Sequence, residues 1–393
     1  MDPELKPKPR SYRWVVLVCY MLAGMVSQLL WITYSPVLAQ ASSAFSVSQS
    51  DIGLLSAVYP LVYVVASIPA GYFVDSAGFR KAILVGTSLL ALSGILRCFS
   101  PNFSVLLVLQ GVGALGQPFI LNSVSKVVKG WFPETEVALA TGMGTLSLFI
   151  GIVLGLGLTP ALVDGFGLSG GLLVYGVFSL VVLLAFFALG KESERRDESA
   201  TNVRFSQVLS VLRNRNILLL SALFFVGLGI FNSFATWVDP LFSAKGIGTD
   251  LSGLLGGVMI IGGVIGSVVI PGLSDRFQTL KKPMLISLAL SAVLWYVLGA
   301  VGGVVPISVT LLVLGFFFMS TLPLALELSA RSLEERLAGM ANSVVWEFSQ
   351  VGGFVLIILY QVIAGSSGWG FLFYFSALLT LIMLGFSFLL KSK

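Results

Sequence analysis

Apolar stretches of about 20 residues recur along the whole chain, with short polar breaks between them. A transmembrane helix needs roughly 20 mostly apolar residues, so each stretch predicts one spanning helix. Strands of a membrane barrel would instead alternate apolar and polar residues over about 10 positions, which these stretches do not. The pattern predicts twelve transmembrane helices, over residues 14–36, 52–74, 82–99, 103–125, 137–160, 168–190, 216–240, 251–274, 283–302, 306–326, 338–363 and 370–390.

One long polar segment interrupts this pattern near the middle of the chain. Residues 191–215 are rich in charge and leave six predicted helices on either side. We therefore expect an all-α membrane protein of two six-helix bundles, residues 1–190 and 216–393, joined by a cytoplasmic linker over residues 191–215.

A shift of 200 residues indicates that the two halves are copies of one unit. Transporters often consist of such duplicated bundles, related by an axis along the membrane normal. Three matches recur at corresponding places of each half: Gly53 with Gly253 at the start of the second predicted helix, and Asp75 with Asp275 and Lys81 with Lys281 where that helix leads to the third.

The composition identifies lipid as the solvent of this chain. Hydrophobic residues make up 56% of the 393 residues and charged residues 10%, with a mean hydropathy of +0.98, whereas soluble domains carry about 25% charged residues. With a cytoplasmic N-terminus, all of the 23 Lys and Arg residues except Arg97 and Lys245 fall on the cytoplasmic side, which is the usual bias. Both termini are therefore expected in the cytoplasm, and the net charge of +5 requires no nucleic-acid partner.

The break after the second predicted helix carries a motif. The segment from Gly71 through Asp75 and Gly78 to Arg80 and Lys81 resembles the signature loop of the major facilitator superfamily, G-x-x-x-D-[RK]-x-G-[RK]-[RK]. In such a loop a carboxylate at a helix end and nearby cations can bridge the two bundles on the cytoplasmic face, while Gly71 allows close helix approach. The resemblance implies two helical bundles that alternate between open states.

The second half repeats part of this motif, and the first copy departs from it. Ser76 stands where Arg or Lys is usual. An alternative interpretation is an inner loop whose positive charge only sets the topology. The predicted gating or coupling residues of the two copies are Gly71, Asp75, Arg80, Lys81, Asp275 and Arg276.

Shorter pieces, over residues 31–35, 117–121 and 349–352, resemble solute carrier family 49, the feline leukaemia virus subgroup C receptor family. Members of that family are linked to choline, ethanolamine, other small organic cations and vitamins, with haem also proposed. The resemblance implies substrate contacts from Trp31, Gln117 and Gln350. It leaves the aromatic contact of the seventh helix open between Phe234 and Trp237.

Polar side chains share one face on four predicted helices. A charged side chain in hydrocarbon costs roughly 2.5–3.5 kcal/mol, so intramembrane polar groups indicate a site. The stripes are Gln28, Trp31 and Ser35; Gln110, Gly113 and Gln117; Asn232, Thr236 and Asp239; and Ser343, Glu347 and Gln350. The alternative for Gln28, Gln110 and Asn232 is a hydrogen bond to a neighbouring helix, and that for Trp31 is an interfacial position.

Glu347 is the strongest candidate among the intramembrane polar residues. It lies near the middle of the eleventh predicted helix, with Gln350 one turn further on. Because Trp is the best cation-π partner for an ammonium group, Glu347 and Trp31 together would suit an ammonium head group. Glu347 would alternatively carry a proton. Asp239, beside Pro240 at the outer end of the seventh helix, is expected to be solvated or to act in gating or proton coupling.

These patterns favour a secondary transporter that moves a small organic solute by alternating access, as a uniporter or symporter. The preferred solute is an organic cation or zwitterion such as a choline-like amine. The alternatives are a proton-coupled carrier of an organic anion, vitamin or drug-like compound and, from another class, a membrane receptor or sensor with a carrier-like fold. The predicted substrate-binding residues are Trp31, Gln117, Asn232, Phe234, Trp237, Glu347 and Gln350.

Other kinds of protein are disfavoured. Leu107 stands where proton-driven drug antiporters carry an Arg in the fourth helix. Two Cys and no His leave no metal-site spacing, and no clustered nucleophile and base indicates an enzyme. We therefore expect no cofactor, a monomer in the cell (inner or cytoplasmic) membrane, and as partners the solute, the lipid bilayer and, in the coupled alternative, a proton.

Overall fold

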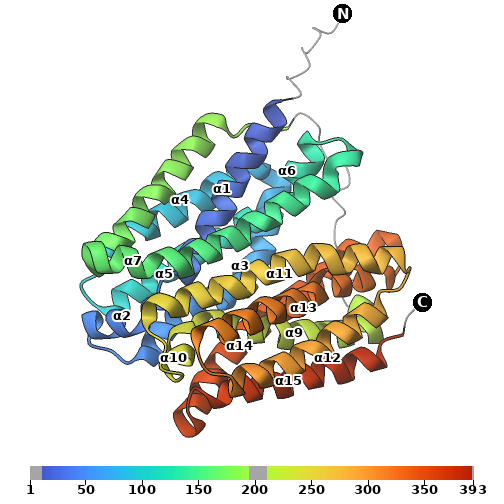
Figure 1. Ribbon diagram of the computed structural model, residues 1–393. Coiled ribbons are helices and arrows are strands. Elements are labelled where there is room, and N and C mark those ends of the chain that lie inside the picture. Colours follow the sequence, from blue (N-terminus) through green and yellow to red (C-terminus); the bar gives the residue numbers. More distant parts are fainter. Residues whose placement is uncertain (1–10, 194–209, 392–393) are drawn as a thin grey trace, which may run out of the picture. The chain divides into compact units, whose positions relative to one another are not determined.

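The computed structural model describes residues 11–193 and 210–391, which form helices and turns (Figure 1). Eleven helices within these ranges are long and apolar enough to cross a membrane. Residues 194–209 of the predicted linker lie outside the described ranges, as do several basic residues that entered the topology prediction. The count of twelve spans and the placement of the termini stay predictions.

The first half begins with a helix that breaks near Trp31. Helix α1 (Tyr12–Ile32) ends before Pro36 and is followed by the short 3₁₀ helix η1 (Ser35–Val37) and by α2 (Leu38–Phe45). Pro36 lacks an N–H group and its ring clashes with the carbonyl four residues earlier, which favours a break in the helix there. The predicted span 14–36 therefore ends four residues too late.

The following helices are close to their predicted spans. They are α3 (Gln49–Ala77), α4 (Phe79–Leu96) with η2 (Arg97–Phe99), α5 (Phe103–Leu121) and α7 (Glu134–Leu189). The short helix α6 (Val124–Trp131), between α5 and α7, was not predicted. Gly78 joins α3 to α4 with φ of 89°, a conformation that glycine adopts readily. The Asn102 side chain caps α5 by accepting from the backbone N–H of Val105.

Helix α7 comprises two helices that meet at a kink. It runs for 56 residues, and Gly167 at φ 69° and ψ 170° breaks the helical backbone. A Cβ built on Gly171 would lie 3.1 Å from the backbone of Leu162 and Val163, so the chain folds back on itself there. Figure 1 shows this turn in α7. The break coincides with the predicted gap between residues 160 and 168.

The second half repeats the pattern of long helices. It contains α9 (Arg215–Thr236), α10 (Val238–Ser243), α11 (Thr249–Arg276), α12 (Lys281–Ala300), α13 (Val304–Arg331), α14 (Glu335–Ser367) and α15 (Phe371–Leu389). Glycines let pairs of these helices approach closely. A Cβ on Gly266 of α11 would overlap the carbonyl oxygen of Phe316 in α13, and one on Gly352 of α14 would overlap that of Phe225 in α9.

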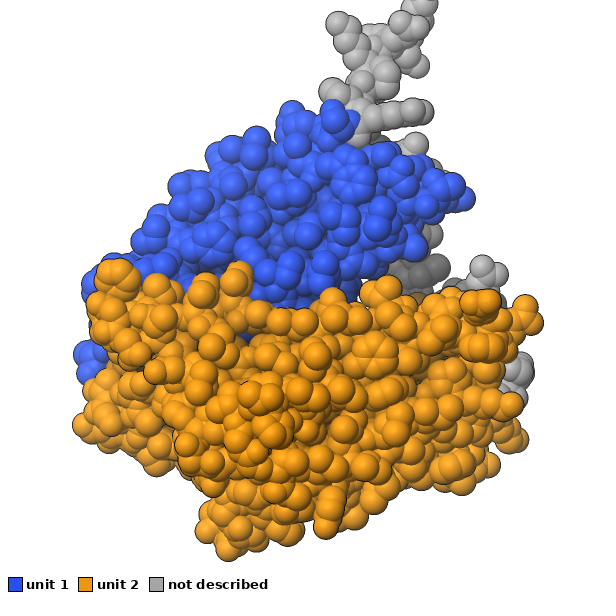
Figure 2. Space-filling view, viewed as in Figure 1, with its two compact units in different colours: residues 1–30, 65–152, 172–200 blue, residues 31–64, 153–171, 201–393 orange. Residues whose placement is uncertain are grey.

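The described chain forms two compact units that do not follow chain order (Figure 2). Unit 1 comprises residues 1–30, 65–152 and 172–200, and unit 2 comprises residues 31–64, 153–171 and 201–393. Unit 2 thus contains the end of α1 and the start of α3 together with the helices of the second half. The predicted division into bundles 1–190 and 216–393 stays a prediction.

Candidate functional site

Four buried amide side chains have no hydrogen-bond partner among the described residues. They are between 5% and 8% exposed, and none makes a hydrogen bond to the protein. None of their polar atoms is among the fully enclosed ones that lack a partner, so each amide keeps accessible surface on which a solute or water can bind. The four are Gln28 and Gln117 in unit 1, and Asn232 and Gln350 in unit 2.

Gln110, on the same stripe as Gln117, makes hydrogen bonds through both its amide oxygen and its amide nitrogen. Its Oε1 accepts from Arg97 Nη1 at 3.3 Å and its Nε2 donates to the carbonyl oxygen of Leu30 at 3.2 Å. Arg97, 1% exposed, also donates to Leu30 O at 3.1 Å. The two side chains satisfy a carbonyl at the end of α1, where the helix leaves it without a helical partner. Gln110 is therefore structural, whereas Gln28 joins the candidate solute contacts.

Trp31 is held in place by α3. The indole Nε1 donates to the carbonyl oxygen of Ser56 at 3.0 Å, and the Ser35 and Ser56 hydroxyls lie 3.3 Å apart. The ring is 4% exposed. The indole N–H is the only hydrogen-bonding group of the Trp31 side chain, and it is already paired. A ligand would therefore contact the faces of the ring.

Asn232 and Gln350 lie on helices α9 and α14, which pack closely in unit 2. A Cβ on Gly353, one turn beyond Gln350, would overlap Asn232 Nδ2 and would lie 3.4 Å from Pro60 Cβ. Pro60 lies one turn after Ser56 on α3, so α3 contacts both Trp31 and the place where Asn232 meets α14. The structure thus places Trp31 of α1 and Asn232 of α9 beside one stretch of α3, with Gln350 one turn along α14 from the contact at Gly353.

Glu347 lies on the same side of α14 as Gln350, three residues earlier, and it is half-buried. It takes part in an interaction within the protein. Its position one turn from an unpaired amide places a carboxyl group beside a neutral hydrogen-bonding group. That combination can serve a cationic group that carries a hydroxyl or amine.

The two aromatic candidates of the seventh helix are enclosed by protein. Phe234 makes edge contacts with Trp295 and Phe242, at centroid distances of 5.6 and 6.0 Å. Trp237 is fully buried, donates from Nε1 to Ile357 O at 3.0 Å, and lies 5.0 Å from the ring of Trp369. Phe234 therefore forms part of an aromatic core in this structure.

Asp239 is buried on the short helix α10, outside the candidate spans. Burial raises the pKa of its carboxyl group, while hydrogen bonds from Thr249, Ser243 and the backbone of Ala39 act in the opposite direction. Ser243 Oγ lies 3.5 Å from Asp239 Oδ1. The alternative that Asp239 is solvated does not describe this structure.

The signature loop is held by contacts inside unit 1. Asp75 Oδ1 lies 2.8 Å from Lys126 Nζ, so α6 supplies a cation although Ser76 replaces the usual basic residue. The Arg80 guanidinium donates to Gly190 O and, at 3.2 Å, to Phe187 O. Arg80 thereby caps the end of α7, where the last carbonyls lack helical partners. Lys81 is exposed and Gly71 half-buried.

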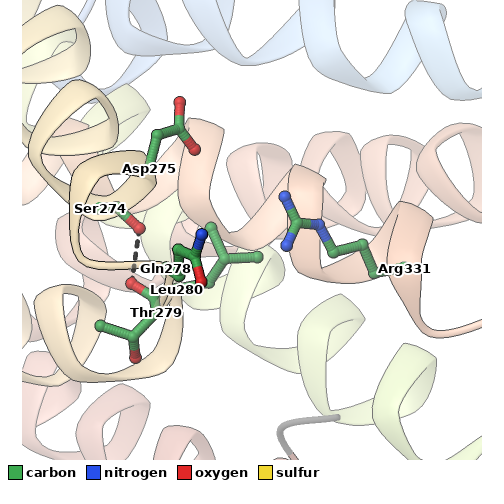
Figure 3. Close-up of a pocket in the computed structure, with 6 residues that line it drawn as sticks. All are labelled: Ser274, Asp275, Gln278, Thr279, Leu280 and Arg331. Carbon is green, nitrogen blue, oxygen red and sulfur yellow. Dashed lines mark hydrogen bonds between the residues drawn. The ribbon is translucent and has the colours of Figure 1, made fainter.

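In the second copy of the loop, Asp275 and Arg331 line a hollow of about 430 Å³ (Figure 3). Ser274 Oγ fixes the turn by donating to Thr279 O at 2.6 Å, and Arg331 pairs with Glu327 at 2.7 Å. Lys281 donates from Nζ to the carbonyl oxygens of Phe388 and Leu390 at the end of α15. Arg276 is exposed.

Sequence comparisons confirm the resemblance to solute carrier family 49. The chain is 26% identical to solute carrier family 49 member A3 of Danio rerio over 372 residues, covering 90% of this chain and 78% of that one. It is 26% identical to the choline/ethanolamine transporter FLVCR1 of Felis catus over 387 residues, covering 90% and 69%. An uncharacterised protein of Archaeoglobus fulgidus is 45% identical over 193 residues, 49% of this chain and 88% of that one.

Solved structures of transporters share the fold. A bacterial homologue of the human lysosomal transporter Spinster, inward-facing and unoccupied, matches with a TM-score of 0.80 and 14% identity, covering 98% of this chain and 97% of that one. A D-xylose-proton symporter matches with a TM-score of 0.79 and 13% identity, covering 97% and 98%. Both of these matched structures are transporters rather than enzymes. The family model described as Major Facilitator Superfamily matches residues 16–357. The chain therefore belongs to the major facilitator superfamily.

Proposed function

We propose that the protein carries a small organic cation or zwitterion, such as a choline-like amine, across the cell (inner or cytoplasmic) membrane by alternating access. The observation that supports this most is the grouping in unit 2 of Trp31, whose N–H is already paired, with the unpaired amides of Asn232 and Gln350. Glu347 lies one turn from Gln350.

The chemistry of these side chains suits an ammonium compound. A quaternary ammonium group neither donates nor accepts ordinary hydrogen bonds, so it is recognised by aromatic faces and by carboxylates. Trp31 offers the first and Glu347 the second, while the amides of Asn232 and Gln350 can pair with a hydroxyl or amine on the same solute. The naming of a 26%-identical relative as a choline/ethanolamine transporter agrees with this class.

The proposed topology has twelve spans, with α7 counted as two because of the break at Gly167. Both termini are placed in the cytoplasm, and the carrier acts as a monomer. Proton coupling is the second candidate, because Asp239 is a buried carboxyl group whose pKa is raised by burial. A coupled carrier would take up a proton there or at Glu347 with each solute.

A thermal-shift experiment with purified protein tests the solute class. A ligand of the folded state at about 100 times its Kd adds about 2.7 kcal/mol to stability. We expect choline to raise the melting temperature and dimethylbutanol, its uncharged carbon isostere, to leave it unchanged. The choline effect should be lost in Glu347→Gln and kept in Glu134→Gln, which changes an exposed glutamate at the start of α7.

The contrary result is equally clear. Stabilisation by an organic anion that Glu347→Gln leaves intact would exclude the cation class and favour the anion or vitamin alternative.

A further inference from the structure

Two glycines that match in the internal repeat are each packed tightly against a side chain or backbone from elsewhere in unit 2. Gly53 lies near the start of α3, and a Cβ built on it would overlap the six-membered ring of Trp237, with Cζ2 at 2.6 Å. Gly253 lies at the same place in α11. A Cβ there would overlap Leu156 O and would lie 3.1 Å from Pro36 Cβ. Both glycines are therefore positions where only a hydrogen atom fits.

The two contacts are reciprocal across the repeat. Gly53, from the first half of the chain, packs against Trp237 from the second half. Gly253, from the second half, packs against Leu156 O and, less closely, against Pro36, both from the first half. A shift of 200 residues places Pro36 on Thr236, the residue before Trp237. Pro36 follows the end of α1, and Trp237 follows the end of α9. Each half thus places the end of its first long helix against the second long helix of the other.

Neither inserted group can move aside easily. Trp237 has no exposed surface, its Nε1 is bonded to Ile357 O at 3.0 Å, and Trp369 lies against it. Pro36 is buried between Ser35, which contacts the Ser56 hydroxyl, and the fully buried Val37. Closely packed interiors transmit an overlap instead of absorbing it.

We propose that Gly53 and Gly253 are the seats of a closure of the solute path, at the end of the path where α1 and α9 terminate. A seat is a glycine against which the other half of the chain packs: Trp237 on Gly53, and Pro36 with Leu156 O on Gly253. The closure forms when both seats are filled, as in this structure, and it opens when α3 and α11 withdraw. A methyl group on either seat keeps it open. The inference rests on the proposed alternating access and not on the identity of the solute. It also assigns Trp237 to closure of the path and not to a solute contact.

Labelling of one buried position in detergent solution tests the closure independently of membrane orientation. Val37 is fully buried in η1 beside Pro36, so a cysteine placed there reacts with a maleimide only when the closure opens. The unsubstituted protein, whose Cys19 and Cys98 are buried, supplies the background. Against Val37→Cys alone, we expect Gly53→Ala to raise the labelling rate by about tenfold, the change that a modest population shift produces.

Gly257→Ala is the matched control. Gly257 lies one turn after Gly253 on α11, and a Cβ there would meet Val153 Cγ1 at an ordinary 3.6 Å. We expect this variant to label like Val37→Cys alone and Gly253→Ala to label like Gly53→Ala. Equal labelling of Gly253→Ala and Gly257→Ala would overturn the proposal.

A second comparison removes the partner instead of the seat. In a Trp237→Leu background the added Cβ of Gly53→Ala no longer meets an indole ring, so the substitution should not raise labelling any further. The same fold increase in both backgrounds would show that the methyl acts elsewhere, and would overturn the proposal. Because no solute is present in either experiment, an error in the solute class changes neither result.

Discussion

Arg80 and Lys281, 201 residues apart, cap the ends of two different helices in the same way. Arg80 donates to Phe187 O and Gly190 O at the end of α7, and Lys281 donates to Phe388 O and Leu390 O at the end of α15. The acceptors are themselves about 200 residues apart. At a shift of 200 residues Lys281 matches Lys81, so the first copy makes the corresponding interaction from the neighbouring residue. In both copies a basic residue of the loop satisfies a helix terminus.

Removal of either cap should destabilise its own half. A cation at a helix C-terminus contributes typically 0.3–1 kcal/mol, and its hydrogen bonds add a similar amount. We expect Lys281→Met to lower the free energy of unfolding by about 1 kcal/mol, measured as a lower melting temperature. Lys282→Met, which changes the neighbouring exposed lysine, is the control and should have little effect.

The two glutamines of α5 should respond oppositely to substitution. Gln110→Leu leaves Arg97 and Leu30 O without a partner that they have in the native protein, so it should cost about 1–3 kcal/mol. Gln117→Leu removes an amide that has no hydrogen-bond partner among the described residues, so it should leave stability unchanged or raised while weakening the solute-induced shift. Melting temperatures with and without choline measure both effects. Equal loss of stability in the two variants would contradict this assignment.

Stability should depend on pH through Asp239. Burial raises the pKa of its carboxyl group above the ordinary 3.8, so the folded protein holds this proton more tightly than the unfolded chain does. The stability that the protonated form provides is complete below the unfolded pKa and is lost as pH rises through the raised folded value.

Asp239→Asn should therefore be more stable than the wild type at neutral pH, and the difference should shrink on acidification. Melting temperatures of both proteins from pH 4 to 8 measure it. A difference that grows towards low pH would show that the ionised form is the favoured one.

Trp31→Leu should reduce the affinity for a quaternary ammonium solute. A cation-π contact is worth about 0.5–2 kcal/mol, which corresponds to a twofold to thirtyfold change in Kd. Trp31→Phe keeps an aromatic face but loses the bond to Ser56 O, so an intermediate affinity is expected. Competition binding with choline measures the series. An unchanged Kd in Trp31→Leu would remove this residue from the site.

The helices could be predicted closely from hydropathy because lipid requires long apolar segments. The ninth predicted span, 283–302, corresponds to Lys281–Ala300, and the gap after residue 160 corresponds to the break at Gly167. The early end of α1 was also readable in principle, since Pro36 is visible in the sequence.

The pairing of polar groups could not be predicted in this way. Gln110 and Gln117 share one stripe, and only the tertiary position of Arg97 separates the paired amide from the unpaired one. Nor does the sequence place the Trp237 ring on Gly53, because those residues are far apart in the chain. Periodicity identifies a face of a helix, but the partner on that face depends on packing between helices.

Helix α3 contains residues of both compact units. Its 29 residues run without a break from Gln49 to Ala77, a length of about 43 Å, with Gly53 near one end and Asp75 near the other. Pro60 and Pro69 lie between these ends, and neither has the N–H group that would bond to the carbonyl four residues earlier. The middle of α3 is therefore its most easily bent part, and it is there that the chain passes from the segment of unit 2 that ends at residue 64 to the segment of unit 1 that begins at residue 65.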